Sequence, residues 1–154
     1  MPATRRRPAG KQKAIRDDPF VLDGSVALAW FFEDELDPYA ERVEDSLARA
    51  TVVVPSLWFL EMANALLVGE RRKRTTGAKV TQFVGLLSAL PVVADGQMDA
   101  RAFGDVMPLA RAHRLSAYDA AYLELAARRG RPLATLDKQL IAAAKATRVA
   151  RYEP

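Results

Sequence analysis

The sequence of 154 residues contains no cysteine and one histidine, His113. Without cysteine the chain has no disulfide, no thiolate zinc site and no cysteine nucleophile. His113 lies between Arg111 and Arg114 at the expected end of a helix, where it caps carbonyl groups or faces solvent. The sequence therefore does not indicate histidine-based catalysis.

Long hydrophobic runs and glycine-rich phosphate loops are also missing. The apolar run VALAWFF, residues 26–32, is far too short to span a bilayer, and the first residues lack the apolar stretch of a secretory signal. Neither G-x-G-x-x-G nor G-x-x-x-x-G-K-[ST] occurs, which removes the usual support for a nucleotide-binding fold. We expect a cytoplasmic protein that does not associate with membranes.

The net charge of +4 belongs to the start of the chain. Residues 1–19 hold six basic and two acidic residues, whereas the remainder has 17 of each and is neutral. This basic segment has too few large apolar residues to order itself, so we expect a disordered tail over 1–19 and one domain over 20–154. The tail is either a solubilising or poorly defined start, or an arm that binds nucleic acid.

Short apolar strands alternate with helices along the domain. Strands are expected near 20–22, 51–54, 91–93 and 132–136, with a possible fifth around Val149. Helices are expected from Gly24, where Ser25 is a candidate N-cap, and over 38–50, 56–74, 77–89, 98–113, 116–129 and 137–147. Continuously apolar strands separated by helices are typical of a parallel sheet that is covered on both faces. We predict a three-layer α/β/α domain with four or five strands.

Four acidic residues lie at the starts of expected helices or inside an apolar helix, namely Asp23, Glu61, Asp119 and Asp137. Asp23 and Asp137 each close an expected strand, and should therefore lie on the same rim of the sheet. Each residue except Glu61 also has a purely structural explanation. Asp119 completes a capping box with Ser116, Asp137 can cap the last helix, and Asp23 can occupy an ordinary turn.

Glu61 is harder to explain as a structural residue. It lies too deep in its helix to be a cap, and apolar residues surround it except for Asn64 on the same face. A carboxylate in such a place needs a partner that offsets its desolvation. A buried arginine or lysine and a metal ion are the two partners that the sequence leaves open.

Taken together, the four acids favour a site for a hard divalent cation. Clustered carboxylates repel one another unless a cation is present, and all-oxygen ligation suits Mg²⁺ or Mn²⁺. Ser25 and Thr135 are hydroxyl residues suited to orient Asp23 and Asp137, although each can also be a plain cap or strand residue. Such a site can hydrolyse phosphodiester bonds without a protein nucleophile.

Four segments of the sequence resemble the motifs of PIN-domain proteins, and more narrowly those of VapC-type toxins from toxin–antitoxin pairs. The combination consists of D-x-S after a strand, E-x-x-N on a helix, S-x-x-D-A-A-Y and T-x-D. The segments are FVLDGSVALAWFFEDE, PSLWFLEMANALL, LSAYDAAYLELAARRG and LATLDKQLIAAA. The likeness runs from Phe20 to the C-terminus and leaves only the basic tail outside it.

The resemblance implies an endoribonuclease that depends on Mg²⁺ or Mn²⁺. It implies that Asp23, Glu61, Asp119 and Asp137 form the metal-binding active site, and that Ser25, Asn64 and Thr135 support it. It also implies a homodimer that is neutralised by a small cognate antitoxin. We add Arg71, Arg72, Lys73 and Arg74 as candidate RNA contacts, although such a run is more often a solvated helix end.

Two other functions compete with this one. A PIN-like module that binds RNA or a partner without cleavage would not need the full set of acids. A phosphatase or nuclease of the haloacid-dehalogenase type would carry D-x-D after its first strand, but position 25 is serine.

Overall fold

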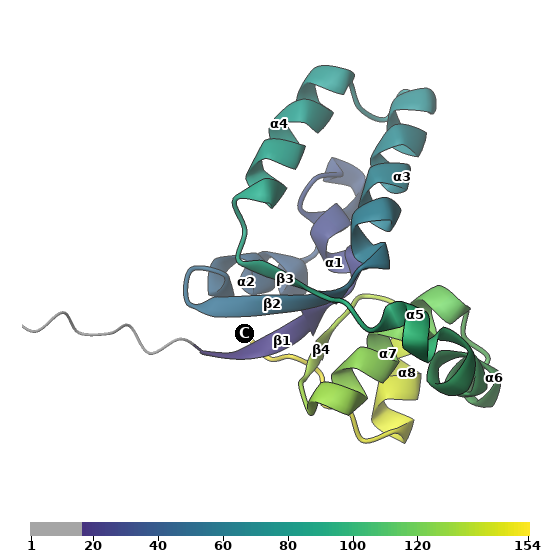
Figure 1. Cartoon of the computed structure of the whole chain (residues 1–154). Coiled ribbons are helices and arrows are strands. Elements are labelled where there is room, and N and C mark those ends of the chain that lie inside the picture. The colour runs from purple at the N-terminus through teal and green to yellow at the C-terminus, as the bar shows by residue number, and fades with distance from the viewer. Residues whose placement is uncertain (1–16) are drawn as a thin grey trace, which may run out of the picture.

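The computed structural model describes residues 17–154, so most of the basic segment, residues 1–16, lies outside it. The described chain forms the predicted α/β architecture around one parallel sheet (Figure 1). Its strands are β1 (Asp17–Leu22), β2 (Ala50–Pro55), β3 (Val92–Asp95) and β4 (Leu133–Ala134). The division into a tail and a domain at residue 19 stays a prediction.

Helices fill the connections between the strands. Those before β3 are α1 (Gly24–Ala29), the 3₁₀ turn η1 (Glu33–Glu35), α2 (Pro38–Ser46), α3 (Leu57–Arg71) and α4 (Gly77–Ser88). Those after β3 are α5 (Met98–Arg101), the π-helical turn η2 (Ala102–Val106), α6 (Met107–His113), α7 (Ala117–Arg129) and α8 (Lys138–Ala146). Figure 1 shows α1, α3 and α4 on one side of the sheet and α5 to α8 on the other.

The sheet has the order β3-β2-β1-β4, and all of its pairs are parallel. The chain moves outward from β1 to β2 and β3, then returns to pair β4 with the opposite edge of β1. The strand order therefore reverses between β1 and β4, which is where open α/β sheets bind their ligands. Phe20, Val21 and Leu22 of β1 are fully buried, as their continuous apolar run predicts.

Several element boundaries differ from the sequence expectation. The helix expected to reach residue 50 ends at Ser46, whose hydroxyl donates to the Val43 carbonyl oxygen at 2.7 Å and competes with further helix formation. The expected fifth strand is reduced to one bridge between Leu133 and Arg151. The helix expected over 98–113 is interrupted by η2 just before Pro108, which has no N–H group to donate.

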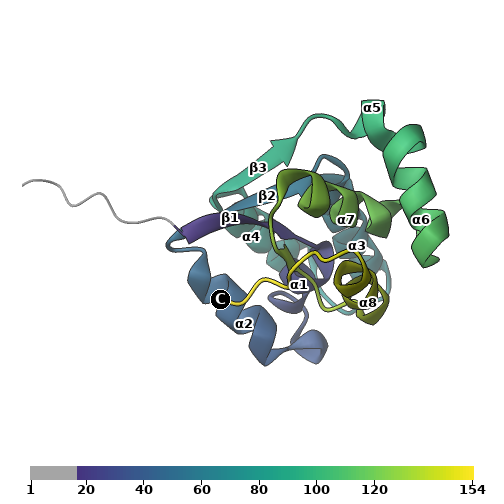
Figure 2. The same ribbon diagram turned by 90° about the horizontal axis from the view of Figure 1, so that it is seen from below.

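The chain end returns to the body of the domain. The C-terminal segment runs beside β4, and the Tyr39 hydroxyl of α2 donates to the Tyr152 carbonyl oxygen at 2.9 Å. Figure 2, seen from below, shows this end next to α2. In the part of the chain that the structure describes, no helix is both long and apolar enough to cross a membrane.

Candidate active site

Asp23 lies directly after β1 and is almost completely buried. Its Oδ2 atom accepts hydrogen bonds from the Ser25 hydroxyl at 2.6 Å and from the Thr135 hydroxyl at 2.7 Å. The backbone N–H of Asp23 donates to the Ala134 carbonyl oxygen at 2.9 Å, which holds the residue at the β1–β4 junction. Ser25 therefore contacts the acid beside which the sequence placed it, whereas Thr135, which the sequence placed beside Asp137, donates its hydroxyl to Asp23 instead.

Ser25 does not have the N-cap role that we expected. The helix α1 begins at Gly24 as expected, so that Asp23 and not Ser25 occupies the N-cap position, without a side-chain cap. The Ser25 hydroxyl is engaged elsewhere, because it donates to Asp23 and accepts the N–H of Leu136 at 3.0 Å. Its position therefore joins the end of β1 to the segment after β4.

Burial raises the pKa of the Asp23 carboxyl above its usual value. The hydrogen bonds from Ser25 and Thr135 oppose this rise, whereas the nearby charges of Asp119 and Asp137 add to it. Asp119 and Asp137 are therefore each close enough to Asp23 to repel its charge. Their repulsion makes a nearby cation favourable.

Glu61 projects from α3 and is half-buried. Its Oε2 atom accepts a hydrogen bond from the hydroxyl of Tyr122 on α7. Burial raises the pKa of Glu61, the bond from Tyr122 lowers it, and the charges of Asp23 and Asp119 raise it. Among residues 17–154, no arginine or lysine pairs with this carboxylate, so its protein partner is a tyrosine.

Asp137 has the capping role that the sequence allowed, whereas α7 is capped by Ser116, and within the described chain the Asp119 carboxylate binds the Ser116 hydroxyl rather than a backbone N–H. The N–H of Asp119 donates to the Ser116 hydroxyl oxygen at 3.0 Å, and that hydroxyl contacts Asp119 Oδ2 at 2.9 Å. Asp137 caps α8 by accepting the N–H of Leu140 at 2.7 Å through Oδ1. These contacts do not consume either carboxylate, because each uses only one of its oxygen atoms.

The four acids Asp23, Glu61, Asp119 and Asp137 share one pattern of hydrogen bonding. Each has one oxygen held by a hydrogen bond within the described chain, while the other oxygen receives none there. Fixed carboxylates with a second oxygen free match the donors that Mg²⁺ or Mn²⁺ requires. No three acidic or histidine side chains in the described part of the chain, as they are arranged, stand close enough to form a complete metal site. The donor set fits a divalent ion that water molecules help to ligate.

The remaining predicted residues lie farther from this arrangement or have other contacts. Asn64 is exposed on α3, and no side-chain hydrogen bond to it is found within residues 17–154. The basic run lies at the end of α3, where Arg74 pairs with Asp34 at 2.8 Å and with Glu35 at 2.7 Å. The Arg74 guanidinium also stacks on Phe32, so its contacts are mainly structural.

Tyr122 is the site residue that sequence reasoning did not single out. Its ring is fully buried in the core, and its hydroxyl reaches Glu61 on the opposite wall of the site. Burial and the contact with Glu61 raise the pKa of the Tyr122 hydroxyl, which therefore stays protonated as a donor. A signal was present, because Tyr122 follows Asp119 by three residues and shares its helix face.

A second charged cluster anchors α7 at its other end. Asp95, at the end of β3, is 1% exposed and accepts hydrogen bonds from Arg128 at 2.7 Å and from Arg129 at 2.5 Å. Burial favours its neutral form, but the two arginines outweigh this effect and lower its pKa to about 2. The Arg128 guanidinium also pairs with Glu124 at 2.7 Å, so this cluster is internally neutralised and structural.

Comparisons with known proteins agree with this geometry. The family model of the PIN domain matches residues 20–146. The fold is similar to the crystal structure of PAE2754 from Pyrobaculum aerophilum, with 22% identity, 88% of each chain covered and a TM-score of 0.61. It is also similar to a chain of VapBC2 from Rickettsia felis bound to a DNA fragment from their promoter, with 15% identity, 88% of this chain and 97% of that chain covered, and a TM-score of 0.59.

The search of curated proteins found no match. The family match nevertheless spans most of the domain and includes all four acids. The chain therefore belongs to the PIN domain family, whose members are generally nucleases.

Proposed function

We propose that the protein is a metal-dependent endoribonuclease that acts as the toxin of a toxin–antitoxin pair. The observation that carries this proposal is that four carboxylates from β1, α3, α7 and the segment after β4 are near enough for Asp23 to feel the charges of Asp119 and Asp137, and Glu61 those of Asp23 and Asp119, while each has one oxygen held and the other free. A purely structural role requires no such set of mutually repelling acids. The alternative of a binding module without cleavage has no comparable explanation for them.

The proposed ligands for Mg²⁺ or Mn²⁺ are Asp23, Glu61, Asp119 and Asp137. When bound, such an ion polarises a phosphoryl oxygen, lowers the pKa of a water molecule and stabilises the leaving oxygen. The chain's own residues orient the acids: Ser25 and Thr135 hold Asp23, and Tyr122 holds Glu61. Burial of Asp23 keeps bulk water from screening its charge.

The proposed substrate is RNA in the cytoplasm, and the proposed partners are a small cognate antitoxin and a second copy of the chain. Support for the antitoxin comes from the likeness to a chain of VapBC2. Support for a protein partner comes from large apolar side chains that are exposed on α3 and α4, namely Phe59, Leu60, Leu67, Val84 and Leu86. Such a surface is more typical of an interface than of a free face.

The decisive experiment compares Asp119→Asn with the parent protein in an RNA cleavage assay with Mn²⁺. We expect the substitution to reduce cleavage at least about a hundredfold, because it removes a metal ligand and its charge. The melting temperature should change little, because asparagine retains the side-chain oxygen that contacts Ser116. Asp45→Asn, an exposed acid on α2, is the matched control and should cleave like the parent.

Equal cleavage by Asp119→Asn and the parent would contradict the proposal, provided that contaminating nucleases are excluded. RNA that binds equally with and without Mn²⁺ and is never shortened would instead identify a binding module. Growth arrest on induction, relieved by the same substitution, would support the toxin assignment.

A further inference from the structure

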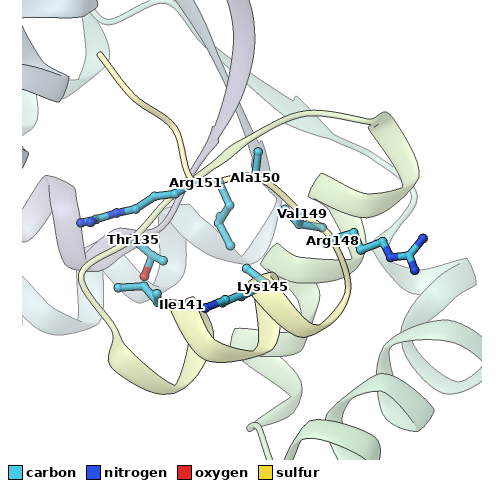
Figure 3. A pocket seen from close by; sticks show the side chains of 9 residues that line it. Thr135, Ile141, Lys145, Arg148, Val149, Ala150 and Arg151 are labelled. Carbon is cyan, nitrogen blue, oxygen red and sulfur yellow. The ribbon is translucent and has the colours of Figure 1, made fainter.

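A pocket of about 400 Å³ lies between α8, β4 and the C-terminal segment (Figure 3). Its volume is in the range of small-ligand sites. The apolar part of its lining consists of Leu133, Ile141, Ala144, Val149 and Ala150. Thr135, Lys145, Arg148 and Arg151 complete the lining, so no acidic residue contributes to it. We refer to this cavity as the β4–α8 pocket.

The β4–α8 pocket begins at the proposed active site. Thr135 forms part of its wall, and the hydroxyl of the same residue donates to Asp23 at 2.7 Å. Ile141, another lining residue, donates its N–H to the carbonyl oxygen of Asp137 at 2.9 Å. Asp23 is therefore in direct contact with a lining residue, and Asp137 lies one helical turn before another.

From that end, one face of α8 leads away from the acids. Asp137, Ile141 and Lys145 follow one another at intervals of four residues, so they lie along one face of α8, and Arg148 comes two residues after the helix ends at Ala146. The face changes from acidic to apolar to basic with distance from the site. This order suits an RNA chain whose scissile phosphate lies at the acids and whose next nucleotide extends along α8.

Lys145 and Arg148 are the cations of the pocket that are available to a ligand. Within residues 17–154, neither Lys145 nor Arg148 forms an ion pair, whereas Arg151 stacks on Tyr39 with 3.9 Å between its guanidinium carbon and the ring centre. Figure 3 shows Lys145 extending toward Ile141, and the guanidinium groups of Arg148 and Arg151 pointing in opposite directions, away from each other. Arg148 also has a left-handed backbone with φ of 61°, which costs free energy that glycine would avoid.

We propose that the β4–α8 pocket binds one nucleotide of single-stranded RNA beside the bond to be cleaved. The apolar lining accepts the face of a base, and Lys145 and Arg148 contact the phosphate backbone. This inference rests on the proposed nuclease function, because it places the substrate strand of that same site. It adds α8 and the C-terminal segment to the RNA-binding surface.

The test measures how tightly a fluorescent single-stranded RNA of mixed sequence binds to Asp23→Asn protein, which should bind without cleaving. Lys145→Ala and Arg148→Gly are introduced together, since alanine favours a helix and glycine favours the left-handed backbone at position 148. Each lost phosphate contact should weaken binding about fivefold at 0.1 M salt and reduce the slope of log K against log salt by about 0.7. The pair should therefore bind about 25-fold more weakly, with an unchanged or higher melting temperature.

Arg42→Ala with Lys79→Ala is the matched control. It removes the same charge from α2 and α4, outside the pocket, and should change RNA binding far less. Ile141→Trp, which fills the pocket without changing the charge, should also weaken binding and lower cleavage when Asp23 is intact.

The outcomes separate the two proposals. If the parent cleaves RNA with Mn²⁺ but the pocket variants bind RNA like the control pair, the pocket inference is wrong and the nuclease assignment stands. If the parent neither binds nor cleaves RNA, both are wrong. If the pocket variants lose binding to the cognate antitoxin but not to RNA, the pocket belongs to a protein partner and the RNA assignment is overturned.

Discussion

At the residue scale, Tyr122 connects the hydrophobic core to the acidic site. Its ring projects from α7 and is fully buried, so packing in the core determines where its hydroxyl lies. Within the described chain, its bond to Glu61 is the side-chain hydrogen bond that joins α3 to α7. Because Asp23 and Asp119 also repel Glu61, this donor offsets part of the cost of holding the carboxylate in place.

Tyr122→Phe should weaken Mn²⁺ binding about tenfold, as expected when a metal ligand loses the hydrogen bond that orients it. Isothermal titration calorimetry measures this affinity directly and without RNA. Tyr39→Phe is the matched control, since it removes another buried tyrosine hydroxyl that donates only to the Tyr152 carbonyl. It should lower stability to a similar extent and leave Mn²⁺ affinity unchanged. In a Glu61→Gln background, Tyr122→Phe should have little further effect, and a full additional loss would contradict the role in positioning.

At the scale of elements, α7 is fixed at both of its ends. Ser116 caps its start and Gly130 ends it in the left-handed conformation with φ of 58°, where glycine is favoured. Near that C-terminal end, Arg128 and Arg129 bind Asp95 on β3. These contacts hold α7 in one position against the sheet, and therefore set where Asp119 and Tyr122 stand.

The Asp95 cluster predicts a stability that depends on pH. Because the pKa of Asp95 is lowered to about 2 from 3.8, its ionised form stabilises the fold above about pH 4, and this contribution is lost as the pH falls toward 2. Asp95→Asn should reduce the free energy of unfolding by about 2 kcal/mol at pH 7, the amount that corresponds to the lowering of the Asp95 pKa from 3.8 to about 2. Urea unfolding at several pH values should show this difference shrinking below pH 4. A difference that is constant with pH would contradict the ion-pair explanation.

At the scale of the whole molecule, the proposed metal site joins parts of the chain that are far apart in sequence. Its acids come from the ends of β1 and β4 and from α3 and α7, and these elements lie on both sides of the sheet (Figure 1). An ion that bridges them should stabilise the folded state, because the unfolded chain does not bring the acids together.

Mn²⁺ should therefore raise the melting temperature of the parent protein. At a concentration a hundred times the dissociation constant, the gain should be about 2.7 kcal/mol. Asp23→Asn should abolish the rise, and EDTA should reverse it in the parent. The same rise in the parent and in Asp23→Asn would show that the ion binds elsewhere, and differential scanning fluorimetry with Mg²⁺ and Mn²⁺ distinguishes these cases.

Much of this architecture follows from local sequence. The apolar runs at 20–22 and 51–54 predict buried parallel strands, and the caps at Ser116, Asp137 and Gly130 are correctly placed, because both effects depend on a residue and its near neighbours. The predicted α/β fold is confirmed by the sheet and by the family match. The roles of the acids and of Asn64 stay predictions.

The sequence by itself determined which acids are anomalous and where strands and helices alternate, since periodicity and capping are short-range effects. Only the tertiary structure decided that the Ser25 hydroxyl binds Asp23 rather than capping a helix, and that Tyr122 is the partner of Glu61. It likewise decided that Arg74 pairs with Asp34 and Glu35. Partners such as Glu61 and Tyr122 are 61 residues apart, and packing of the helices on the sheet brings them together. No local pattern encodes that contact, because it depends on the path of the whole chain.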